Sequence, residues 1–293
     1  MIIGENILFG IAFYAAILWS VQLVITVTFV VTLIYGATYY DRSETTGSRA
    51  WRALRRCSWW GRCRRFYRHE VRTADFDASG RADVPCLFAA SPHGVNAASF
   101  FFSFIALTEE MQTRLGGKAI ECGIWNLFFW FPILREIVLA LGCVNVRWHT
   151  IESALRVRGS HFALIPGGVY EIAPAVPPPP RTGFLKLAYS LQDRADCAFV
   201  YLENEAKVYS TWGDRWRFRQ WALALIGVPI TFYFGPRPTH PLRVWIGARH
   251  VYREGESYVE YEARWFKAVG ELKARVDAAA GAEQSLADGK KET

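Results

Sequence analysis

The sequence predicts an α/β fold with a mostly parallel central sheet flanked by helices, behind an N-terminal hydrophobic membrane anchor. Two observations lead to this fold class. Short apolar runs alternate with helix-length segments after residue 73, which is the pattern of a parallel sheet covered on both faces. Ahead of them, residues 6–40 contain no Asp, Glu, Lys or Arg, which is typical of a segment that faces lipid.

Residues 1–40 form the predicted anchor. Its charge-free run is 35 residues long, from 6 to 40, whereas one upright spanning helix needs about 20. The run is slightly short for two full spans and a loop. One long tilted helix, a tight hairpin and a span with an interfacial turn all fit this length. A cleaved signal peptide is disfavoured, because residues 1–6 lack a basic start and the apolar run is too long.

Residues 41–72 form a basic, aromatic juxtamembrane segment with ten arginines and five aromatic residues. Arginines beside a hydrophobic span mark the cytoplasmic side, and Trp and Tyr prefer the membrane interface. These arginines either hold anionic lipid headgroups or form a solvated face that only sets topology. Nucleic-acid binding is disfavoured, because no nucleic-acid-binding motif accompanies the charge.

The main folded domain is predicted at residues 73–281. Strands are predicted at 84–90, 118–122, 162–165, 197–201, 231–234 and 242–246. Helices are predicted at 96–111, 134–141, 151–158, 182–193 and 257–280. The proline run from Pro174 to Pro180 predicts an extended loop. Residues 282–293 are polar and predict a disordered tail.

The composition favours a membrane-bound protein with an anionic ligand. Hydrophobic residues make up 52% of the chain, and such an excess indicates apolar surface for lipid or an apolar substrate. The net charge of +7 suits an anionic membrane surface or an anionic co-substrate. The six cysteines show no paired spacing for a metal site, so we expect no metal and, inside apolar runs, reduced and buried thiols.

Two short motifs carry the chemistry. Ser91-Pro92-His93-Gly94 follows one predicted strand, and residues 165–171, Ile-Pro-Gly-Gly-Val-Tyr-Glu, follow another. Both therefore lie at carboxyl ends of strands, where α/β sheets bind ligands. A histidine and a glutamate held on turns there suit acid–base catalysis. A purely structural hydrogen bond is the alternative role for His93.

These motifs resemble the type-2 diacylglycerol acyltransferase and monoacylglycerol acyltransferase family. Residues 91–94 are similar to its His-Pro-His-Gly signature, with Ser91 in place of the first His. Residues 165–171 and 181–188 are similar to its Pro-Gly-Gly-x-x-Glu and Arg-x-Gly-Phe-x-x-x-Ala elements. Residues 125–142, which contain Arg135-Glu136, and residues 203–205, Glu-Asn-Glu, resemble two further blocks. The resemblance therefore extends over most of the chain.

The resemblance implies that His93 is catalytic and that the acyltransferase domain comprises residues 73–281. The broader glycerolipid acyltransferase superfamily pairs this His with an Asp five residues later, but Ala98 stands at that position. Glu171 is therefore the expected acidic partner, which would orient His93 directly or support its turn. Because the position of Ser91 varies in the family, Ser91 is not expected to be the base.

The resemblance also nominates substrate-binding residues: Pro92, Gly94, Arg135, Glu136, Pro166, Gly167, Gly168, Arg181, Gly183, Phe184 and Asn204. The turn at 166–168 is either a simple tight turn or an oxyanion site made of backbone amides. Arg181 either binds a phosphate of coenzyme A or forms a salt bridge. Neighbours on a helix point about 100° apart, so Arg135 and Glu136 need not pair. We expect one to face the site and the other to lock the fold.

The implied function is acyl-CoA-dependent O-acyl transfer to diacylglycerol or monoacylglycerol, with acyl-CoA as co-substrate and no other cofactor. Another lipid alcohol, giving a wax ester or an acylated lysophospholipid, is the alternative acceptor, and a catalytically silent lipid-droplet protein is the alternative class. The implied location is the endoplasmic reticulum membrane or a lipid droplet, with the domain in the cytosol, and a homo-oligomer remains open. Residues 100–107 and 124–134 offer further apolar surface for one leaflet.

Overall fold

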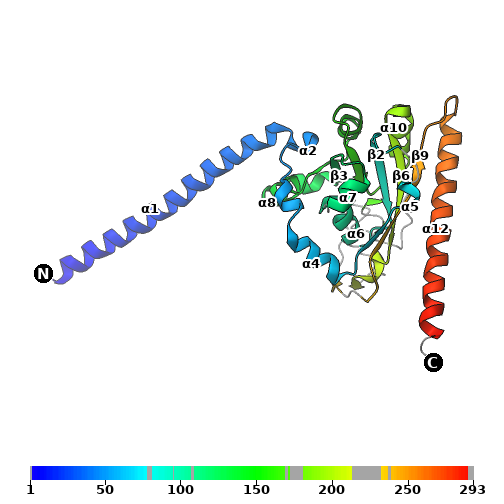
Figure 1. Ribbon diagram of the computed structural model, residues 1–293. Coiled ribbons are helices and arrows are strands. Elements are labelled where there is room, and N and C mark those ends of the chain that lie inside the picture. Colours follow the sequence, from blue (N-terminus) through cyan, green and yellow to red (C-terminus); the bar gives the residue numbers. More distant parts are fainter. Residues whose placement is uncertain are drawn as a thin grey trace. The chain divides into compact units, whose positions relative to one another are not determined.

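The computed structural model describes residues 2–77, 81–94, 96–106, 109–168, 171, 181–212, 232–236 and 239–289. The chain divides into two compact units, residues 1–43 and residues 44–293. The first unit is dominated by one helix, and the second contains the sheet and the helices that cover it (Figure 1).

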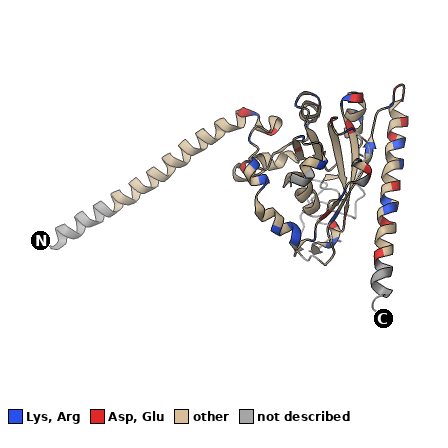
Figure 2. Ribbon diagram, in the orientation of Figure 1, with Lys and Arg blue, Asp and Glu red and all other residues tan. Residues whose placement is uncertain are grey.

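The first unit is a single long helix, α1 (Ile2–Ala37), followed by a short turn of helix, η1 (Thr38–Asp41). Of the three arrangements compatible with the sequence, the structure has the long helix and no hairpin in its described part. A helix of 36 residues is about 54 Å long, more than the roughly 30 Å of a bilayer core, so it would cross with tilt or with its ends outside. The stretch Tyr14–Thr46 contains an 18-residue window with mean hydropathy 2.3, so it is apolar and long enough to span a membrane. In Figure 2, the part of α1 that is not drawn in grey carries no charged residue.

The second unit is built on a seven-stranded sheet with strand order β1-β9-β6-β2-β5-β3-β4. All neighbouring strands are parallel except β6 and β9. The mostly parallel central sheet predicted from the sequence is therefore confirmed. The strands are β1 (Glu70–Arg72), β2 (Cys86–Ser91), β3 (Ile120–Ile124), β4 (Cys143–Asn145), β5 (His161–Leu164), β6 (Asp196–Glu203) and β9 (Arg243–His250). A separate two-stranded sheet pairs β7 (Ser210–Trp212) with β8 (Phe232–Phe234).

Helices cover both faces of the sheet (Figure 1). Before β1 come α2 (Ser43–Thr46), α3 (Arg52–Arg55) and α4 (Ser58–Phe66), and α5 (Ala74–Asp77) lies between β1 and β2. Then follow α6 (Ala98–Phe100), η2 (Phe101–Ile105), α7 (Glu109–Arg114), η3 (Asn126–Phe129), α8 (Pro132–Ala140), α9 (Trp148–Glu152) and η4 (Ser153–Val157). The chain ends with α10 (Gly183–Leu191), η6 (Gln192–Arg194), η7 (Glu205–Lys207) and α12 (Tyr258–Gly289).

Strand β2 shows why the sheet is buried on both faces. Cys86, Phe88 and Ala90 belong to one core cluster, and Leu87 and Ala89 belong to the other. Side chains alternate between the faces of a strand, so a continuous apolar run requires cover on both. Side chains of η2 and α8 pack on the first face, and side chains of η4, α10 and α12 pack on the second. This rigid double layer positions the loops that follow the strands.

The structure corrects the prediction of one helix over residues 96–111. This part consists of α6, the π-helical η2 and, further on, α7. Where η2 ends, Arg55 donates hydrogen bonds to the carbonyls of Phe104 and Ile105, and Arg64 donates to the carbonyl of Phe102. Cations at a helix C-terminus satisfy carbonyls that have no partner within the helix. Arg55 and Arg64 of the basic segment 41–72 therefore stabilise the fold through these hydrogen bonds.

Two further expectations from the sequence are wrong. Residues 100–107 were expected to offer apolar surface to a membrane, but Phe100, Phe104 and Ile105 are buried in the core. The tail from residue 282 was expected to be disordered, but α12 continues to Gly289. Arg243 holds this last part of the helix through an ion pair of 2.7 Å with Glu283. The partner lies 40 residues earlier in the chain, so the composition of the tail alone could not reveal it.

Four of the six cysteines lie in the core, as expected. Cys86, Cys122, Cys143 and Cys197 are buried and unbridged. Burial raises the pKa of the Cys122 thiol to about 12 and raises the pKa of the Cys143 thiol well above its ordinary value. A thiol that stays protonated is a poor nucleophile. A core role is therefore favoured for both.

His161 generates a prediction about the pH dependence of stability. The Cys86 amide donates to its Nδ1 (2.9 Å), and its Nε2 lies 2.6 Å from the Leu115 carbonyl oxygen, so the buried ring is held neutral. Burial lowers the pKa of His161 from 6.5 to about 4. The unfolded chain therefore binds the proton first, and stability should fall as pH drops from about 6.5 to about 4.

Thermal unfolding of the detergent-solubilised protein across this pH range tests the prediction. His161→Gln should flatten the acid-side slope, because it removes a contribution of up to about 3 kcal/mol. His149→Gln is the matched control, because His149 is exposed, and should leave the slope unchanged. An unaltered slope in His161→Gln would contradict the assignment.

Candidate active site

Three neighbouring parallel strands bring the sequence motifs to one edge of the sheet. β2 pairs in parallel with β5 on one side and with β6 on the other. The loops that follow these strands begin after Leu164, Ser91 and Glu203. Carboxyl ends of parallel strands share one edge of a sheet, so the two predicted motifs and the Glu-Asn-Glu element meet there.

The carboxylate of Glu171 joins the loop after β5 to the turn after β2. Its Oε2 accepts a hydrogen bond of 2.8 Å from the backbone N–H of His93, and its Oε1 accepts one of 3.0 Å from the Ser91 hydroxyl. Hydrogen bonds to a carboxylate are stronger than bonds between neutral groups. The sequence left open whether Glu171 orients the His93 side chain directly or supports its turn. Because these two bonds go to the His93 backbone and to Ser91, Glu171 supports the turn.

Two glycines make room for this arrangement. A Cβ on Gly167 would overlap the carboxylate of Glu171, so a side chain at this position would push the carboxylate away. Gly94 has φ of +58°, and a Cβ there would lie 3.0 Å from the Glu205 carbonyl oxygen. Only glycine combines a left-handed backbone with so close an approach at little cost. The glycines of both motifs are therefore required by the geometry of the turns.

The imidazole of His93 is held by the same loop that carries Glu171. Its Nε2 lies 2.6 Å from the carbonyl oxygen of Gly168. Since a carbonyl only accepts hydrogen bonds, Nε2 carries the proton and Nδ1 of the neutral ring keeps its lone pair. The side chain is 6% exposed, and among the described residues Nδ1 has no hydrogen-bond partner. This ring is therefore arranged to accept a proton at Nδ1.

Glu205 is a site residue that the sequence reasoning did not nominate. It is buried, and its Oε1 accepts a hydrogen bond from the backbone N–H of Ser99, close to the start of α6. Burial raises the pKa of this carboxyl group, and its Oε2 has no hydrogen-bond partner within the described part of the chain. Glu205 therefore fixes the helix that begins directly after the His93 turn. The Glu-Asn-Glu motif was the signal for it, although only Asn204 was selected.

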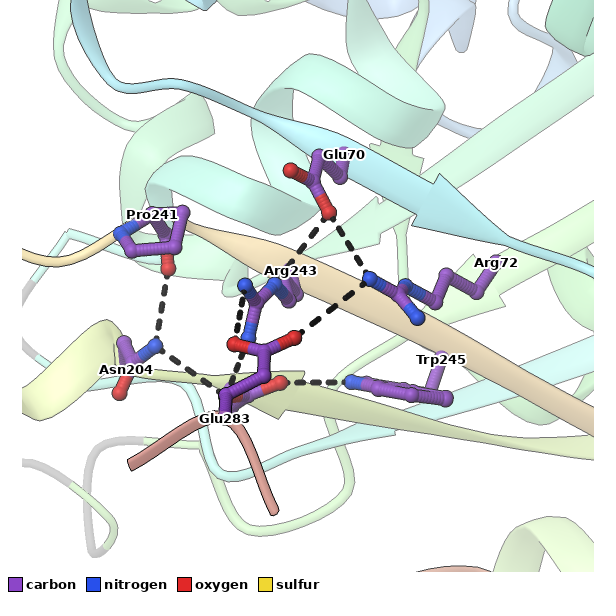
Figure 3. A network of polar contacts seen from close by, with 8 residues as sticks. Glu70, Arg72, Asn204, Pro241, Arg243, Trp245 and Glu283 are labelled. Atoms are coloured by element: carbon purple, nitrogen blue, oxygen red, sulfur yellow. Dashed lines mark hydrogen bonds and ion pairs between the residues drawn. The ribbon is translucent and has the colours of Figure 1, made fainter. Parts of the chain in front are cut away.

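Asn204 belongs to a polar network at the end of β6 (Figure 3). Its backbone is left-handed, with φ of +67°. Its amide donates to the Pro241 carbonyl at 2.9 Å and to Glu203 Oε1 at 3.3 Å. In the same network Arg243 pairs with Glu203 and Glu283. These contacts favour a role for Asn204 in positioning the strand end that presents Glu205, and its substrate contact stays a prediction.

Arg135 and Glu136 form ion pairs with each other and with the juxtamembrane segment. Their side chains pair at 3.1 Å, an outcome that the sequence had left open. Arg135 is fully buried and also pairs with Glu44 at 3.4 Å, and Glu136 pairs with Arg49 at 2.9 Å. The further partner of each residue lies in the segment 44–49, so both side chains are drawn toward the same segment. Both residues therefore tie α8 to the start of the second unit, and a substrate-binding role is untested.

The remaining nominated residues border the loops. The Arg181 guanidinium would lie 3.7 Å from a Cβ on Gly168, so it stands beside the Pro-Gly-Gly turn. Phe184 packs edge-on against Trp265 in the core, with ring centroids 5.6 Å apart. Gly183 begins α10, Pro92 is exposed and Pro166 is half-buried.

Parts of the surroundings of the site lie outside the described residues, namely 95, 169–170 and the proline run within 172–180. Within the described ranges, no three side chains of His, Cys, Asp or Glu form a group that could hold a metal ion.

The fit between Gly167 and Glu171 generates a test. Gly167→Ala should destabilise the fold by about 1–3 kcal/mol, because the added methyl displaces a hydrogen-bonded carboxylate. Gly270→Ala, in the open part of α12, is the control, and should be neutral or stabilise by up to about 1 kcal/mol. In a Glu171→Ala background the cost of Gly167→Ala should shrink. Chemical denaturation measures all four variants, and an unchanged cost in that background would refute the contact.

Comparison with known proteins identifies the family of the chain. Residues 15–235 match the family described as Diacylglycerol acyltransferase. The chain is 20% identical over 205 residues to Diacylglycerol O-acyltransferase 2B of Umbelopsis ramanniana, covering 66% of this chain and 57% of that protein. It is 27% identical over 128 residues to human 2-acylglycerol O-acyltransferase 1, covering 41% and 37% of the two chains. It is 26% identical over 156 residues to human Acyl-CoA wax alcohol acyltransferase 2, covering 48% and 46%.

The matches thus span between 37% and 57% of the length of these three curated relatives. No solved structure gives a significant match. The family match includes His93, Glu171 and Glu205, so it contains the whole constellation at the edge of the sheet. Because that match covers well over half of the sequence, the chain belongs to the diacylglycerol acyltransferase family.

Proposed function

We propose that this protein is a membrane-associated O-acyltransferase that moves an acyl group from acyl-CoA to the hydroxyl of diacylglycerol or monoacylglycerol. The observation that carries the proposal is the fixed tautomer of His93, whose Nε2 faces the Gly168 carbonyl and whose Nδ1 has no partner among the described residues. Family membership supports the reaction class. The names of two relatives, one a diacylglycerol and one a 2-acylglycerol O-acyltransferase, support the acceptor class.

In the proposed reaction His93 acts first as a base and then as an acid. Nδ1 takes the proton of the acceptor hydroxyl while the hydroxyl oxygen attacks the thioester carbonyl carbon. The tetrahedral intermediate then collapses, the C–S bond breaks, and the coenzyme A thiolate takes the proton from Nδ1. The Gly168 carbonyl faces the ring throughout, so it stabilises the positive charge that the imidazole carries between the two steps.

The backbone around the ring suggests where the oxyanion is held. The Gly168 amide already donates to the Ile165 carbonyl at 3.2 Å, so the Gly167 amide is the better candidate of the two glycine amides. Arg181 stands beside this turn at the surface. Its guanidinium is suited to a phosphate of coenzyme A, because it offers several donors in a plane. The acyl-CoA side of the site is therefore proposed next to the turn at 166–168.

A specific observation keeps a second acceptor class open. The chain is also similar to a wax alcohol acyltransferase, at 26% identity. A long-chain alcohol and a glycerolipid present the same hydroxyl chemistry, and the shape of the apolar pocket decides between them. A lysophospholipid is a further acceptor of this class. A catalytically silent lipid-droplet protein is disfavoured, because His93 and its partners are retained in a working geometry.

The proposed location is the cytosolic side of the endoplasmic reticulum membrane, with lipid droplets as a second location and a homo-oligomer as an open possibility. Ten arginines follow the apolar helix, which favours the cytosolic side. Acyl-CoA is a cytosolic substrate, which requires the same orientation. A C-terminal tag that resists protease in sealed microsomes until detergent is added would place the domain in the lumen instead.

The activity test uses purified full-length protein, labelled acyl-CoA and a panel of monoacylglycerol, diacylglycerol, lysophospholipid and long-chain alcohol acceptors. His93→Ala should lower the turnover of the preferred acceptor by about 10²–10⁴-fold, because it removes the base. Ser91→Ala should lose less than about tenfold, because the second bond of Glu171 to the turn remains.

His149→Ala is the matched control, because this histidine is exposed, and should keep full activity. Thermal unfolding of each variant shows whether it is folded. Undiminished turnover by folded His93→Ala would refute the mechanism, and no turnover by the unaltered protein with any acceptor would refute the proposed function.

A further inference from the structure

An exposed apolar patch lies on η3 and α8, and its residues take no part in the hydrogen bonds that hold Glu171 and His93 in the candidate active site. We call it the α8 patch. Its members are large apolar side chains that are more than one third exposed: Trp125, Phe128, Trp130, Phe131, Ile133 and Ile137. Ile133 is 79% exposed and Trp130 is 75% exposed. Contiguous apolar surface of this kind marks a site that contacts membrane or protein.

The orientation of α8 is fixed by its other face. Val138 and Leu139 are buried in the core, and Arg135 is buried in its ion pairs. Residues four apart lie on the same face of a helix, so Ile133 and Ile137 are presented outward together. The patch is therefore held in place by the rigid fold of the second unit.

The same helix is tied to the first residues of the second unit. Glu44 pairs with Arg135, Arg49 pairs with Glu136, and the Trp51 amide donates to the Ala140 carbonyl at 2.8 Å. Glu44 follows the end of the apolar helix α1 by seven residues. Seven residues reach at most about 25 Å, so chain length alone limits how far Glu44 can lie from the last residue of α1.

The composition of the patch suits the boundary between headgroups and acyl chains. Tryptophan prefers this boundary, and Ile and Phe gain from burial among the acyl chains. Exposed arginine and tryptophan also stand next to the point where the chain joins α8, at Trp51 and Arg52. Arginine near a membrane surface is attracted by anionic lipids. The occupant that fits both features is an anionic phospholipid leaflet.

We propose that the α8 patch inserts into the leaflet from which α1 emerges, as a second membrane contact of the chain. The second unit would then sit on the membrane as a monotopic domain. Of the two apolar segments expected to reach lipid, the one at 124–134 carries this contact, whereas Phe100, Phe104 and Ile105 of the other segment belong to the core. The proposal rests on surface and connectivity and does not depend on the proposed chemistry.

The test places a fluorescent label on the full-length protein in phosphatidylcholine/phosphatidylserine vesicles, with and without brominated lipid as a quencher. The two cysteines that are not buried, Cys57 and Cys63, are first replaced by serine. Ile133→Cys then carries the label on the patch. Val259→Cys on α12 is the matched control, because Val259 is 72% exposed and Ile133 is 79% exposed.

Brominated lipid should quench the label at 133 severalfold more than the label at 259. Equal quenching at the two positions would overturn the proposal. Weak quenching at 133 together with cross-links between two copies through this cysteine would also overturn it, because the patch would then be a contact between two chains. No acyl-CoA is present in the experiment, so its outcome is independent of whether the protein transfers acyl groups.

Discussion

The candidate site depends on one carboxylate, that of Glu171, which closes the turn of His93 onto the loop after β5. Without this carboxylate, the His93 amide and the Ser91 hydroxyl would be hydrogen-bond donors without this acceptor, next to a buried ring. The same loop accepts a hydrogen bond from the imidazole at the Gly168 carbonyl. One loop therefore sets both the backbone and the tautomer of His93, and Gly167 is needed because any side chain would occupy the space of the carboxylate.

This arrangement follows from the order of the strands. β5, β2 and β6 are neighbours in the sheet, so loops separated by about 40 to 110 residues in sequence meet at one edge. The loop after β6 supplies Glu205, which secures the start of α6 and contacts Gly94. The site is thus buttressed from both sides by rigid elements, which is what a base with a defined tautomer requires.

Much of this could be predicted from the sequence, because local patterns encode it. The alternation of apolar runs and helices gave the parallel sheet, and the Gly/Pro turns located His93 and Glu171 at strand ends. Contacts between distant residues could not be read in this way. The antiparallel pairing of β9, the bond of Glu171 to a backbone amide, and the helical extension held by Glu283 and Arg243 each join residues far apart in the chain. The ion pairs of Arg135 with Glu44 and of Glu136 with Arg49 likewise join residues about 90 positions apart.

The central claim is that the ring of His93 keeps its proton on Nε2 and offers Nδ1 to the substrate. Nitrogen-15 NMR of histidine-labelled protein, with His93→Gln as the subtracted spectrum, measures this directly. The account predicts that the signals lost in the variant are a protonated Nε2 and an unprotonated Nδ1. Signals that place the proton on Nδ1 would contradict it, because the ring would then have no lone pair where a hydroxyl proton must be accepted.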